Sequence, residues 1–393
     1  MNFKVKTHNA IAESGLTMLT EASFSVSEEE NDPDAIILRS YKLPVDELNN
    51  SLKAVARAGA GFNNVPVKEC SEKGIVVFNT PGANANAVKE IVLAGLLMSS
   101  RGIYAGASFV NEINGIDSKD LKAHIESGKK EFKGRELKGA TLGVVGMGAI
   151  GAQVAGMGVF LDMEVIGYDP AITVEAAWKL PNNVSRTDNL KTIFTNSDYV
   201  TLHVPAIEAT KNLIDHSVLS ECKADLKLIN FARDEIVDSG AIIKALESGQ
   251  LGSYVTDFAD LDLIKRAKEV GDVIILPHIG ASTRQAEENC SVMAADQLKD
   301  FLENGNIKNS VNFPELIEER QSDFRLTLSN RNVAGMIGQI TTILAENNIN
   351  IVELINKSRE EIAYNVIDLE TKPSDKVIED LEALENVINV RAI

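Results

Sequence analysis

A glycine-rich turn is the first feature of the sequence that could do chemistry. The apolar run that begins at Thr141 leads into Gly-x-Gly-x-x-Gly and then into residues that favour a helix. The first glycine of such a turn allows a tight bend, the second lets the backbone approach a pyrophosphate, and the third lets the helix pack on the strand. The helix N-terminus then offers free N–H groups to the phosphates. The predicted dinucleotide site comprises Gly146, Gly148, Ala149, Ile150 and Gly151.

An acidic residue follows this turn at the distance that the dinucleotide interpretation requires. Asp169 ends the next apolar run, 18 residues after Gly151. A carboxylate there accepts hydrogen bonds from the ribose hydroxyls and repels a 2′-phosphate, so the cofactor is predicted to be NAD rather than NADP. The alternative is a glycine-rich turn followed by an acid by chance. The combination of strand, turn, helix and acid favours the cofactor site.

Polar residues also follow the later apolar runs. Arg233, the acids Asp257 and Asp262, and His278 each lie at or just after the end of a predicted strand, where ligands bind in an open α/β sheet. Taken singly, such a histidine is more often structural and such an arginine more often a solvated charge. Together with the dinucleotide turn they indicate a site that holds a substrate and takes up a proton.

The elements that must position these residues form an α/β protein with a parallel sheet in each of two Rossmann-like, doubly wound domains. Short β-rich runs alternate with helical stretches up to about residue 80 and again from Thr141, and a long apolar helix is predicted over about 86–101. The last seventy or so residues have the order βαββαβ, which is a ferredoxin-like unit, beyond a polar stretch at 309–323 that we interpret as a linker. The predicted domains are 1–90 with 284–313, 91–283, and 322–393.

Composition excludes several classes of function. The chain has 393 residues with 39 Lys and Arg against 57 Asp and Glu, so its formal charge of −18 argues against nucleic-acid binding and against an acidic membrane surface. Its three cysteines and five histidines show no metal-ligand spacing, and we expect no metal. The first residues lack the apolar core of a signal peptide, so a cytoplasmic location is expected.

The motifs together resemble those of the D-2-hydroxyacid dehydrogenase family over about residues 1–313. The resemblance rests on the dinucleotide turn, the Ala-Arg loop at Arg233, the stretch 257–262 where the family has Asp-x-Phe-x-x-Glu, and the Pro-His-Ile-Gly motif at His278. It implies that Arg233 binds the substrate carboxylate and carbonyl oxygen and that His278 is the acid/base. The residues that it places around the cofactor are Phe231, Ala232, Arg233, Asp257, His278 and Gly280.

Two departures from the family pattern affect the predicted site. The family's glutamate, which orients the histidine, falls on Asp262, and aspartate is one methylene shorter, so its contact with His278 would be longer or require a backbone shift. Asp234 and Glu235 follow Arg233 where the family usually has glycine, and their negative charge should weaken the capture of an anion.

Within this family, the early residues resemble the members that act on 3-phosphoglycerate. Arg39 lies in a run similar to their phosphate-binding strand, Arg57 in a run similar to their glycine-rich substrate loop, and Asn84 matches a residue that contacts substrate. Lys129 lies in a segment that crosses to the neighbouring subunit in the family, although a solvated helix end is the slightly stronger interpretation. The resemblance therefore implies 3-phosphoglycerate as substrate and a homo-oligomer, either dimer or tetramer.

The C-terminal unit resembles an ACT regulatory domain. In serine-inhibited relatives the effector contacts two asparagines, which match Asn332 and Asn350, whereas their histidine is Asn330 here. L-serine is therefore a candidate effector. Two other interpretations remain: a D-2-hydroxyacid dehydrogenase for glycerate, lactate or a 2-hydroxyglutarate-type acid, or a non-catalytic protein that senses NAD and an amino acid.

Overall fold

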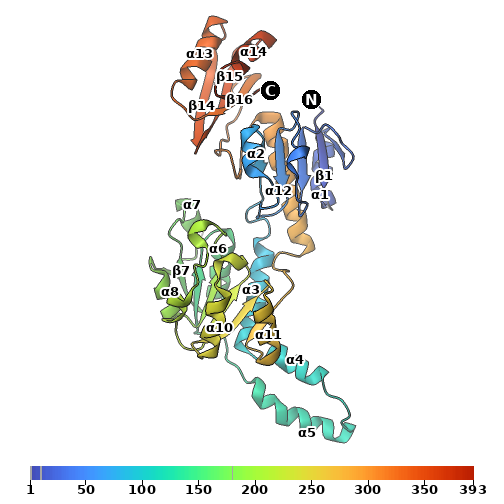
Figure 1. The fold of residues 1–393 in the computed structure, drawn as a ribbon, viewed down its shortest axis with the longest axis vertical. Coiled ribbons are helices and arrows are strands. Elements are labelled where there is room, and N and C mark those ends of the chain that lie inside the picture. The colour runs from blue at the N-terminus through green and yellow to red at the C-terminus, as the bar shows by residue number, and fades with distance from the viewer. Residues whose placement is uncertain (1, 9–10, 179) are drawn as a thin grey trace. The chain divides into compact units, whose positions relative to one another are not determined.

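The structure is a computed structural model that describes residues 2–8, 11–178 and 180–393 (Figure 1). Contacts divide the chain into two compact units, one made of residues 1–84 and 283–393 and the other of residues 85–282. The C-terminal βαββαβ unit packs into the first of these two units. The three domains expected from the sequence therefore stay a prediction.

The first unit begins with a parallel five-stranded sheet in the order β2-β1-β3-β4-β5. Every residue of β3 and β5 is buried, which explains why these two strands appear in the sequence as continuous apolar runs. Helices α1 and α12 pack together beside the sheet. The elements are β1 (Lys4–His8), α1 (Glu13–Glu21), β2 (Ser25–Ser27), β3 (Ala35–Leu38), η1 (Val45–Glu47), β4 (Ala54–Arg57), α2 (Val67–Glu72), β5 (Val76–Phe78) and α12 (Arg284–Asn304).

The second unit contains a parallel seven-stranded sheet in the order β12-β11-β10-β9-β6-β7-β8. The strand order reverses at the β6–β9 pair, so a crevice for a ligand is expected at the carboxyl ends of these strands. The strands are β6 (Thr141–Val145), β7 (Glu164–Tyr168), β8 (Val184–Arg186), β9 (Tyr199–Leu202), β10 (Leu226–Asn230), β11 (Leu251–Thr256) and β12 (Val273–Ile275). The helices are α3 (Ala85–Ser100), α4 (Ile103–Asn111), α5 (Ser118–Gly128), η2 (Lys129–Phe132), α6 (Ala149–Phe160), α7 (Val174–Ala177), α8 (Leu190–Asn196), η3 (Glu208–Thr210), α9 (His216–Leu219), η4 (Asp234–Ile236), α10 (Ser239–Glu247) and α11 (Leu261–Glu269).

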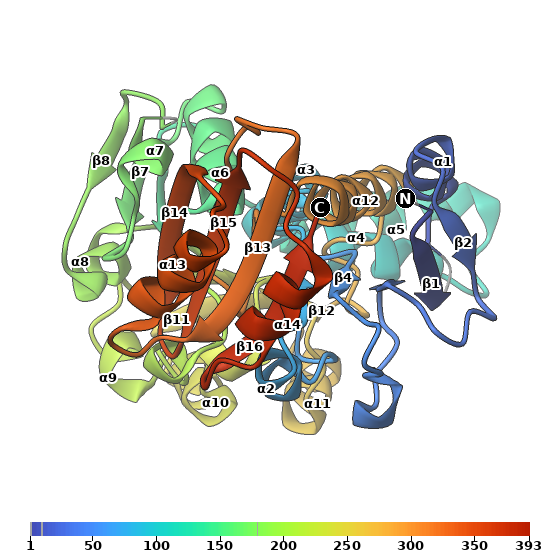
Figure 2. The same ribbon diagram turned by 90° about the horizontal axis from the view of Figure 1, so that it is seen from above.

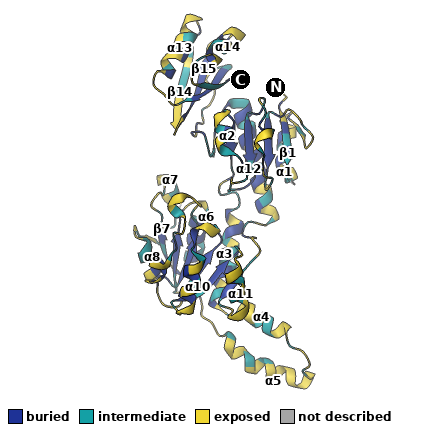
Figure 3. Cartoon of the chain, in the orientation of Figure 1, coloured by how far each residue is buried: buried dark blue, intermediate teal, exposed yellow. Residues whose placement is uncertain are grey.

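The segment after α3 leaves the core of the second unit. Helices α4 and α5 extend away from the seven-stranded sheet, and Figure 3 shows them as largely exposed. Within the described ranges no single helix is both long and apolar enough to cross a membrane.

The C-terminal residues form the predicted ferredoxin-like unit, an antiparallel sheet in the order β14-β15-β13-β16. Helices α13 and α14 contact each other on one face of this sheet (Figure 2). Its elements are β13 (Phe324–Arg331), α13 (Met336–Glu346), β14 (Ile351–Arg359), β15 (Ile362–Leu369), α14 (Asp375–Glu382) and β16 (Val387–Ala392). With the two doubly wound sheets, this unit confirms the predicted fold class.

The other face of the C-terminal sheet is also covered, because all eight residues of β15 are buried. On that face Tyr364 and Val366 share one apolar core with Phe301 of α12 and with Phe313. Phe313 and Leu316 are each only 1% exposed, so the prediction of a polar linker at 309–323 is wrong for its middle. Two apolar side chains anchor that segment to the sheet despite the polar residues around them.

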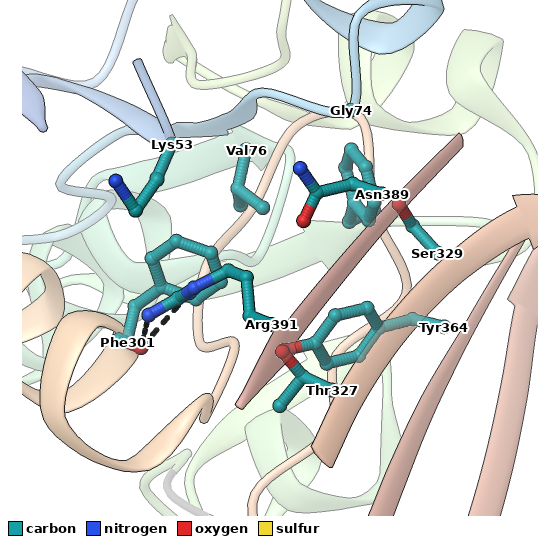
Figure 4. Close-up of a pocket in the computed structure, with 10 residues that line it drawn as sticks. Lys53, Gly74, Val76, Phe301, Thr327, Ser329, Tyr364, Asn389 and Arg391 are labelled. Atoms are coloured by element: carbon teal, nitrogen blue, oxygen red, sulfur yellow. Dashed lines mark hydrogen bonds between the residues drawn. The ribbon is translucent and has the colours of Figure 1, made fainter. Parts of the chain in front are cut away.

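Polar contacts join the same face of the sheet to the end of α12. Figure 4 shows Arg391 beside Phe301, with its guanidinium carbon 4.5 Å from the ring centroid and its Nη2 donating to the carbonyl oxygen of Leu302 at 3.0 Å. The Tyr364 hydroxyl donates to the carbonyl oxygen of Gly305 at 2.7 Å. The last carbonyl groups of a helix have no partners within it, so these side chains cap α12.

A buried arginine fastens the connecting segment to the C-terminal sheet. Arg325, with a fully buried side chain, donates to both carboxylate oxygens of Asp368 at 2.7 and 2.9 Å. It also donates to the carbonyl oxygens of Asn304, Glu318 and Glu319 at 3.0 to 3.1 Å. All five of its N–H donors are therefore in use, as a buried guanidinium requires.

Candidate active site

The glycine turn has the form that the sequence predicts. It joins β6 to α6, and Gly146 has a φ of +90°, which favours glycine. A Cβ at Gly151 would lie 1.9 Å from the carbonyl oxygen of Gly146, so only glycine lets α6 approach the turn this closely. Around Gly148 a Cβ would meet no heavy atom within 4 Å. The turn is therefore open where a pyrophosphate would lie, and Ala149 and Ile150 begin the helix that faces it.

Asp169 lies directly after β7, beside the glycine turn. Its Oδ2 accepts the N–H of Met147 at 2.8 Å, and its Oδ1 accepts the N–H of Ala171 at 2.9 Å. A carboxylate has about four lone-pair sites, so acceptors remain for ribose hydroxyls. The bond to Met147 adds a role that the sequence did not predict, because Asp169 also holds the turn in place.

A second group of predicted residues gathers at the ends of β10, β11 and β12. Asp257 is 2% exposed, and its Oδ2 accepts the N–H of Gly280 at 2.8 Å while its Oδ1 has no partner in the described part of the chain. Burial raises the pKa of Asp257, and the Gly280 N–H bond and the nearby His278 and Arg233 partly oppose that rise. The unpartnered oxygen fits a site for a ligand that donates N–H groups, such as the carboxamide of NAD.

The loop that carries Arg233 is held by a residue that sequence reasoning missed. Asn230 is fully buried at the end of β10, and its Nδ2 donates to the carbonyl oxygen of Arg233 at 2.8 Å. Its Oδ1 accepts the N–H of Ala232 at 3.0 Å. Phe231 and Ala232 are buried, whereas the Arg233 side chain is half-buried. A polar residue at the end of an apolar strand, just before the predicted Ala-Arg loop, was the available signal.

His278 lies on an exposed loop after β12 with its backbone in the left-handed region, at a φ of +49°. Its N–H donates to the carbonyl oxygens of Asp257 at 3.0 Å and Leu276 at 3.1 Å. The ring of Phe258 meets the imidazole edge to face, with centroids 5.1 Å apart. Phe258 was not predicted to take part in the site, and it gives His278 an apolar wall.

Asp262 lies in the first turn of α11 and is exposed. Between Asp262 and His278, both described residues, the structure contains no hydrogen bond or ion pair. The pairing of these side chains therefore stays a prediction, since catalytic contacts often tighten only when a substrate binds. Next to Arg233, a hydrogen bond with Asp234 raises the pKa of Glu235.

His203 lies outside the predicted catalytic set. Burial lowers the pKa of His203 to about 3, and its Nε2 lies 3.0 Å from the Thr201 hydroxyl. It therefore stays neutral at physiological pH. Among the residues described, no three His, Cys, Asp or Glu side chains are grouped to hold a metal ion.

In the first unit the two predicted substrate arginines lie at the carboxyl ends of neighbouring strands. Arg57 ends β4 and is opposite Leu38, and Arg39 follows Leu38 directly. The Nε of Arg57 donates to the carbonyl oxygen of Arg39 at 3.0 Å. Asn64, which sequence reasoning missed, donates to the same oxygen at 3.1 Å. The structure thus brings Arg39 and Arg57 together, as adjacent parallel strands require.

The two remaining predicted substrate residues, Asn84 and Lys129, belong to different units of the chain. Asn84 closes the first stretch of the first unit, and its carboxamide oxygen has no hydrogen-bond partner in the described part of the chain. Lys129 belongs to η2 of the second unit, is exposed and pairs with Glu126. Both assignments stay predictions.

The two predicted effector residues lie at opposite ends of the C-terminal sheet. Asn332 follows β13, whose last residue is opposite Ile362, whereas Asn350 precedes β14, whose first residue is opposite Leu369. Ile362 and Leu369 are the two ends of the strand β15. A single chain therefore cannot place both asparagines around one small amino acid.

Comparisons with known proteins agree with this geometry. Residues 94–280 match the NAD-binding domain of the D-isomer specific 2-hydroxyacid dehydrogenases, and residues 324–386 match the ACT domain. A D-3-phosphoglycerate dehydrogenase of Haemophilus influenzae is 31% identical over 342 residues, which cover 85% of this chain and 79% of that protein. The chain belongs to the D-2-hydroxyacid dehydrogenase family. Its second unit contains an NAD-binding domain, and its C-terminal unit is an ACT domain.

Other relatives carry the same name but are longer. A D-3-phosphoglycerate dehydrogenase of Synechocystis sp. is 34% identical over 313 residues, which cover 78% of this chain but 54% of that protein. The chain thus spans just over half the length of that relative, and 62% of the one from Methanocaldococcus jannaschii.

Among solved structures, the chain is similar to an NAD+-bound 3-phosphoglycerate dehydrogenase of Entamoeba histolytica. The TM-score is 0.63 at 26% identity, over 80% of this chain and all of that one. The prediction of NAD as the cofactor is confirmed by the match to the NAD-binding domain.

Proposed function

We propose that the protein oxidises 3-phospho-D-glycerate to 3-phosphohydroxypyruvate with NAD, the first step of L-serine biosynthesis. The observation that carries this proposal is the pair Arg39 and Arg57 on neighbouring strand ends of a chain whose net charge is −18. Two arginines on neighbouring strand ends of so acidic a protein favour a phosphorylated, and not merely carboxylated, substrate. The names of the relatives support the same substrate.

The residues of the second unit supply the chemistry. When bound, NAD accepts the hydride that leaves C2 of the substrate. Arg233 binds the substrate carboxylate and carbonyl oxygen, and the buried Asp257 orients the cofactor through its free oxygen. His278 takes the proton of the C2 hydroxyl, with Asp262 as the predicted counter-charge.

Assembly and regulation belong to the same proposal. Asn84 contacts substrate from the same chain, and Lys129 contacts it from a neighbouring subunit of a homo-oligomer, either dimer or tetramer. We place the enzyme in the cytoplasm. The ACT domain binds L-serine through Asn332 of one copy and Asn350 of another, because the register of the sheet separates these residues within one chain.

The deciding experiment compares initial rates of NAD reduction with 3-phosphoglycerate and with D-glycerate. We expect kcat/KM to be higher by at least about 10²-fold for the phosphorylated acid, because it alone engages the arginine pair with a charge-assisted, bidentate group. Equal rates with both acids would leave the family assignment intact but exclude the phosphate site. In that case lactate and 2-hydroxyglutarate become the next substrates to test.

One observation favours a second candidate function. Among the described residues, Asp262 makes no hydrogen bond or ion pair with His278, and the acids Asp234 and Glu235 follow Arg233. A protein that senses NAD and an amino acid without turnover is therefore the alternative. It predicts NADH binding by fluorescence titration with no oxidation of any 2-hydroxy acid.

A further inference from the structure

One ion pair in the first unit involves a residue that neither the sequence motifs nor the family comparison assigns. The Oε1 atom of Glu287 lies 2.6 Å from Nη1 of Arg39. Glu287 is in the first turn of α12, whose start is fixed by the Thr283 hydroxyl, which accepts the N–H of Ala286 at 3.1 Å. The side chains of Arg39 and Glu287 are 33% and 44% exposed, so a ligand from solution can reach the pair.

The charges around this pair come from three elements. Arg39 follows β3, Arg57 ends β4 with its Nε on the carbonyl oxygen of Arg39, and Glu287 begins α12. Cys290 lies one turn further along α12, where burial raises the pKa of its thiol and the charges of Arg57 and Arg39 partly oppose the rise. Arg39 faces this end of α12 through its contact with Glu287, and the charge of Arg57 also acts on the Cys290 thiol there. Arg39 therefore has a carboxylate partner before any ligand arrives.

We propose that Glu287 is an internal counter-ion that a substrate phosphate must displace from Arg39, and that it thereby sets the affinity of the site for phosphorylated ligands. The inference rests on the proposed function, in which Arg39 binds the phosphate. A phosphate monoester carries nearly two charges at neutral pH and three acceptor oxygens, so it competes with a single tethered carboxylate for the guanidinium fork. A hydroxyl group, as in D-glycerate, carries no charge and leaves the Arg39–Glu287 pair intact.

The counter-ion weakens the binding of every phosphate ligand by the same factor. The effect on occupancy of the site nevertheless differs between ligands. Inorganic phosphate has no second anchor, so the added cost keeps it from occupying the site. A substrate with a carboxylate bound elsewhere tolerates the same cost, because its remaining contacts still hold it. Glu287 thus lowers the occupancy of the site by phosphate alone, whereas a ligand that carries a phosphate together with a second bound group still occupies it.

The first experiment removes the carboxylate and keeps its shape. We expect Glu287→Gln to lower the Kd for inorganic phosphate, measured by calorimetry, by about 1.5- to fivefold, which is the range for an exposed ion pair. The KM for 3-phosphoglycerate should fall by the same factor, whereas the KM for D-glycerate should not change. Glu287→Ala should behave alike. NADH binding and thermal unfolding show whether each variant is folded.

Glu288→Gln is the matched control, because it removes the same charge from the same helical turn. Glu288 pairs with Arg284 at 4.0 Å and not with Arg39. It should leave the Kd for phosphate unchanged, and adding Arg39→Gln to Glu287→Gln should abolish the gain. Unchanged phosphate affinity in folded Glu287→Gln and Glu287→Ala would overturn the proposal, and so would an equal gain for D-glycerate. If the wild-type protein does not turn over 3-phosphoglycerate, the proposed function fails, and the phosphate titration still tests the role of Glu287.

Discussion

Replacing Asp368 by alanine should destabilise the ACT domain strongly. Arg325 has no exposed surface, and Asp368 is its only charged partner among the described residues. Removing the carboxylate leaves a buried positive charge with three carbonyl groups but no counter-ion. Breaking a buried pair in this way costs about 3–5 kcal/mol, much more than losing an exposed pair.

Hydrogen exchange of the whole protein measures this loss of stability locally, in the strands that carry Arg325 and Asp368. The chain contains several domains, so a single unfolding transition would not report on one of them. Peptides from β13 and β15 should exchange about 10²- to 10⁴-fold faster in Asp368→Ala, since every 1.4 kcal/mol corresponds to a factor of ten. An increase below about tenfold would refute the reasoning, because it would mean that Arg325 keeps its charge solvated without Asp368.

Two controls separate this effect from the loss of any ion pair. Asp188→Ala removes the ion pair between Arg186 and Asp188, whose side chains are 70% and 82% exposed. It should change the free energy of opening by less than about 1 kcal/mol.

The dependence of stability on pH is the second check. Burial alone would raise the pKa of Asp368, but hydrogen bonds from Arg325 and from the N–H of Gln321 bring it below its usual value. The contribution of this group to stability is therefore complete above about pH 4 and is lost as the pH falls through the lower folded-state pKa.

Four further predictions concern the proposed cofactor, catalytic and effector sites. Asp169→Ala should weaken NADH binding and narrow the preference over NADPH in fluorescence titrations; an unchanged ratio of the two affinities would remove Asp169 from the cofactor site. His278→Ala should lower kcat by about 10²–10⁴ with NADH binding nearly intact, and Asp262→Asn should lower kcat and shift the acid limb of the pH profile downward. Neither effect in Asp262→Asn would show that the motif alignment is wrong, and near-normal turnover without His278 would move the base elsewhere. L-serine should slow the full-length enzyme but not Asn350→Ala or Asn332→Ala, and mixing the two variants should restore some inhibited sites if each site takes one asparagine from each copy; an absence of serine binding by calorimetry would leave the ACT domain as an assembly element.

Sequence patterns predicted the buried parallel strands well, because such strands are continuous apolar runs. The apolar runs at 35–38 and 141–145 are the strands β3 and β6, with the same bounds. The edge strand β8, Val-Ser-Arg, was missed because it is short and largely exposed, so it carries no apolar signal. The anchoring role of Phe313 was missed because the stretch 309–323 was interpreted as a polar linker as a whole.

Parts of the candidate site that depend on neighbouring residues could be predicted from the sequence, and parts that depend on distant residues could not. The glycine turn could be predicted because each glycine answers a local steric need. The roles of Asn230 and Phe258 depend on loop geometry, which spacing alone does not reveal. The Arg39–Glu287 pair joins residues from opposite ends of the catalytic part of the chain, so only the folded structure brings them together.

Because the ACT domain caps α12, removing this domain by truncation would destabilise the rest of the first unit. A truncation before Phe324 would remove Arg391 and Tyr364, leaving the last carbonyl groups of the helix without partners and the rings of Phe301 and Phe313 in water. The shortened protein would therefore be prone to aggregate, and lost activity would say nothing about regulation. Point substitutions at the effector residues are the safer way to separate control from catalysis. A designed two-domain version would need polar replacements for both phenylalanines and a new cap after Asn304.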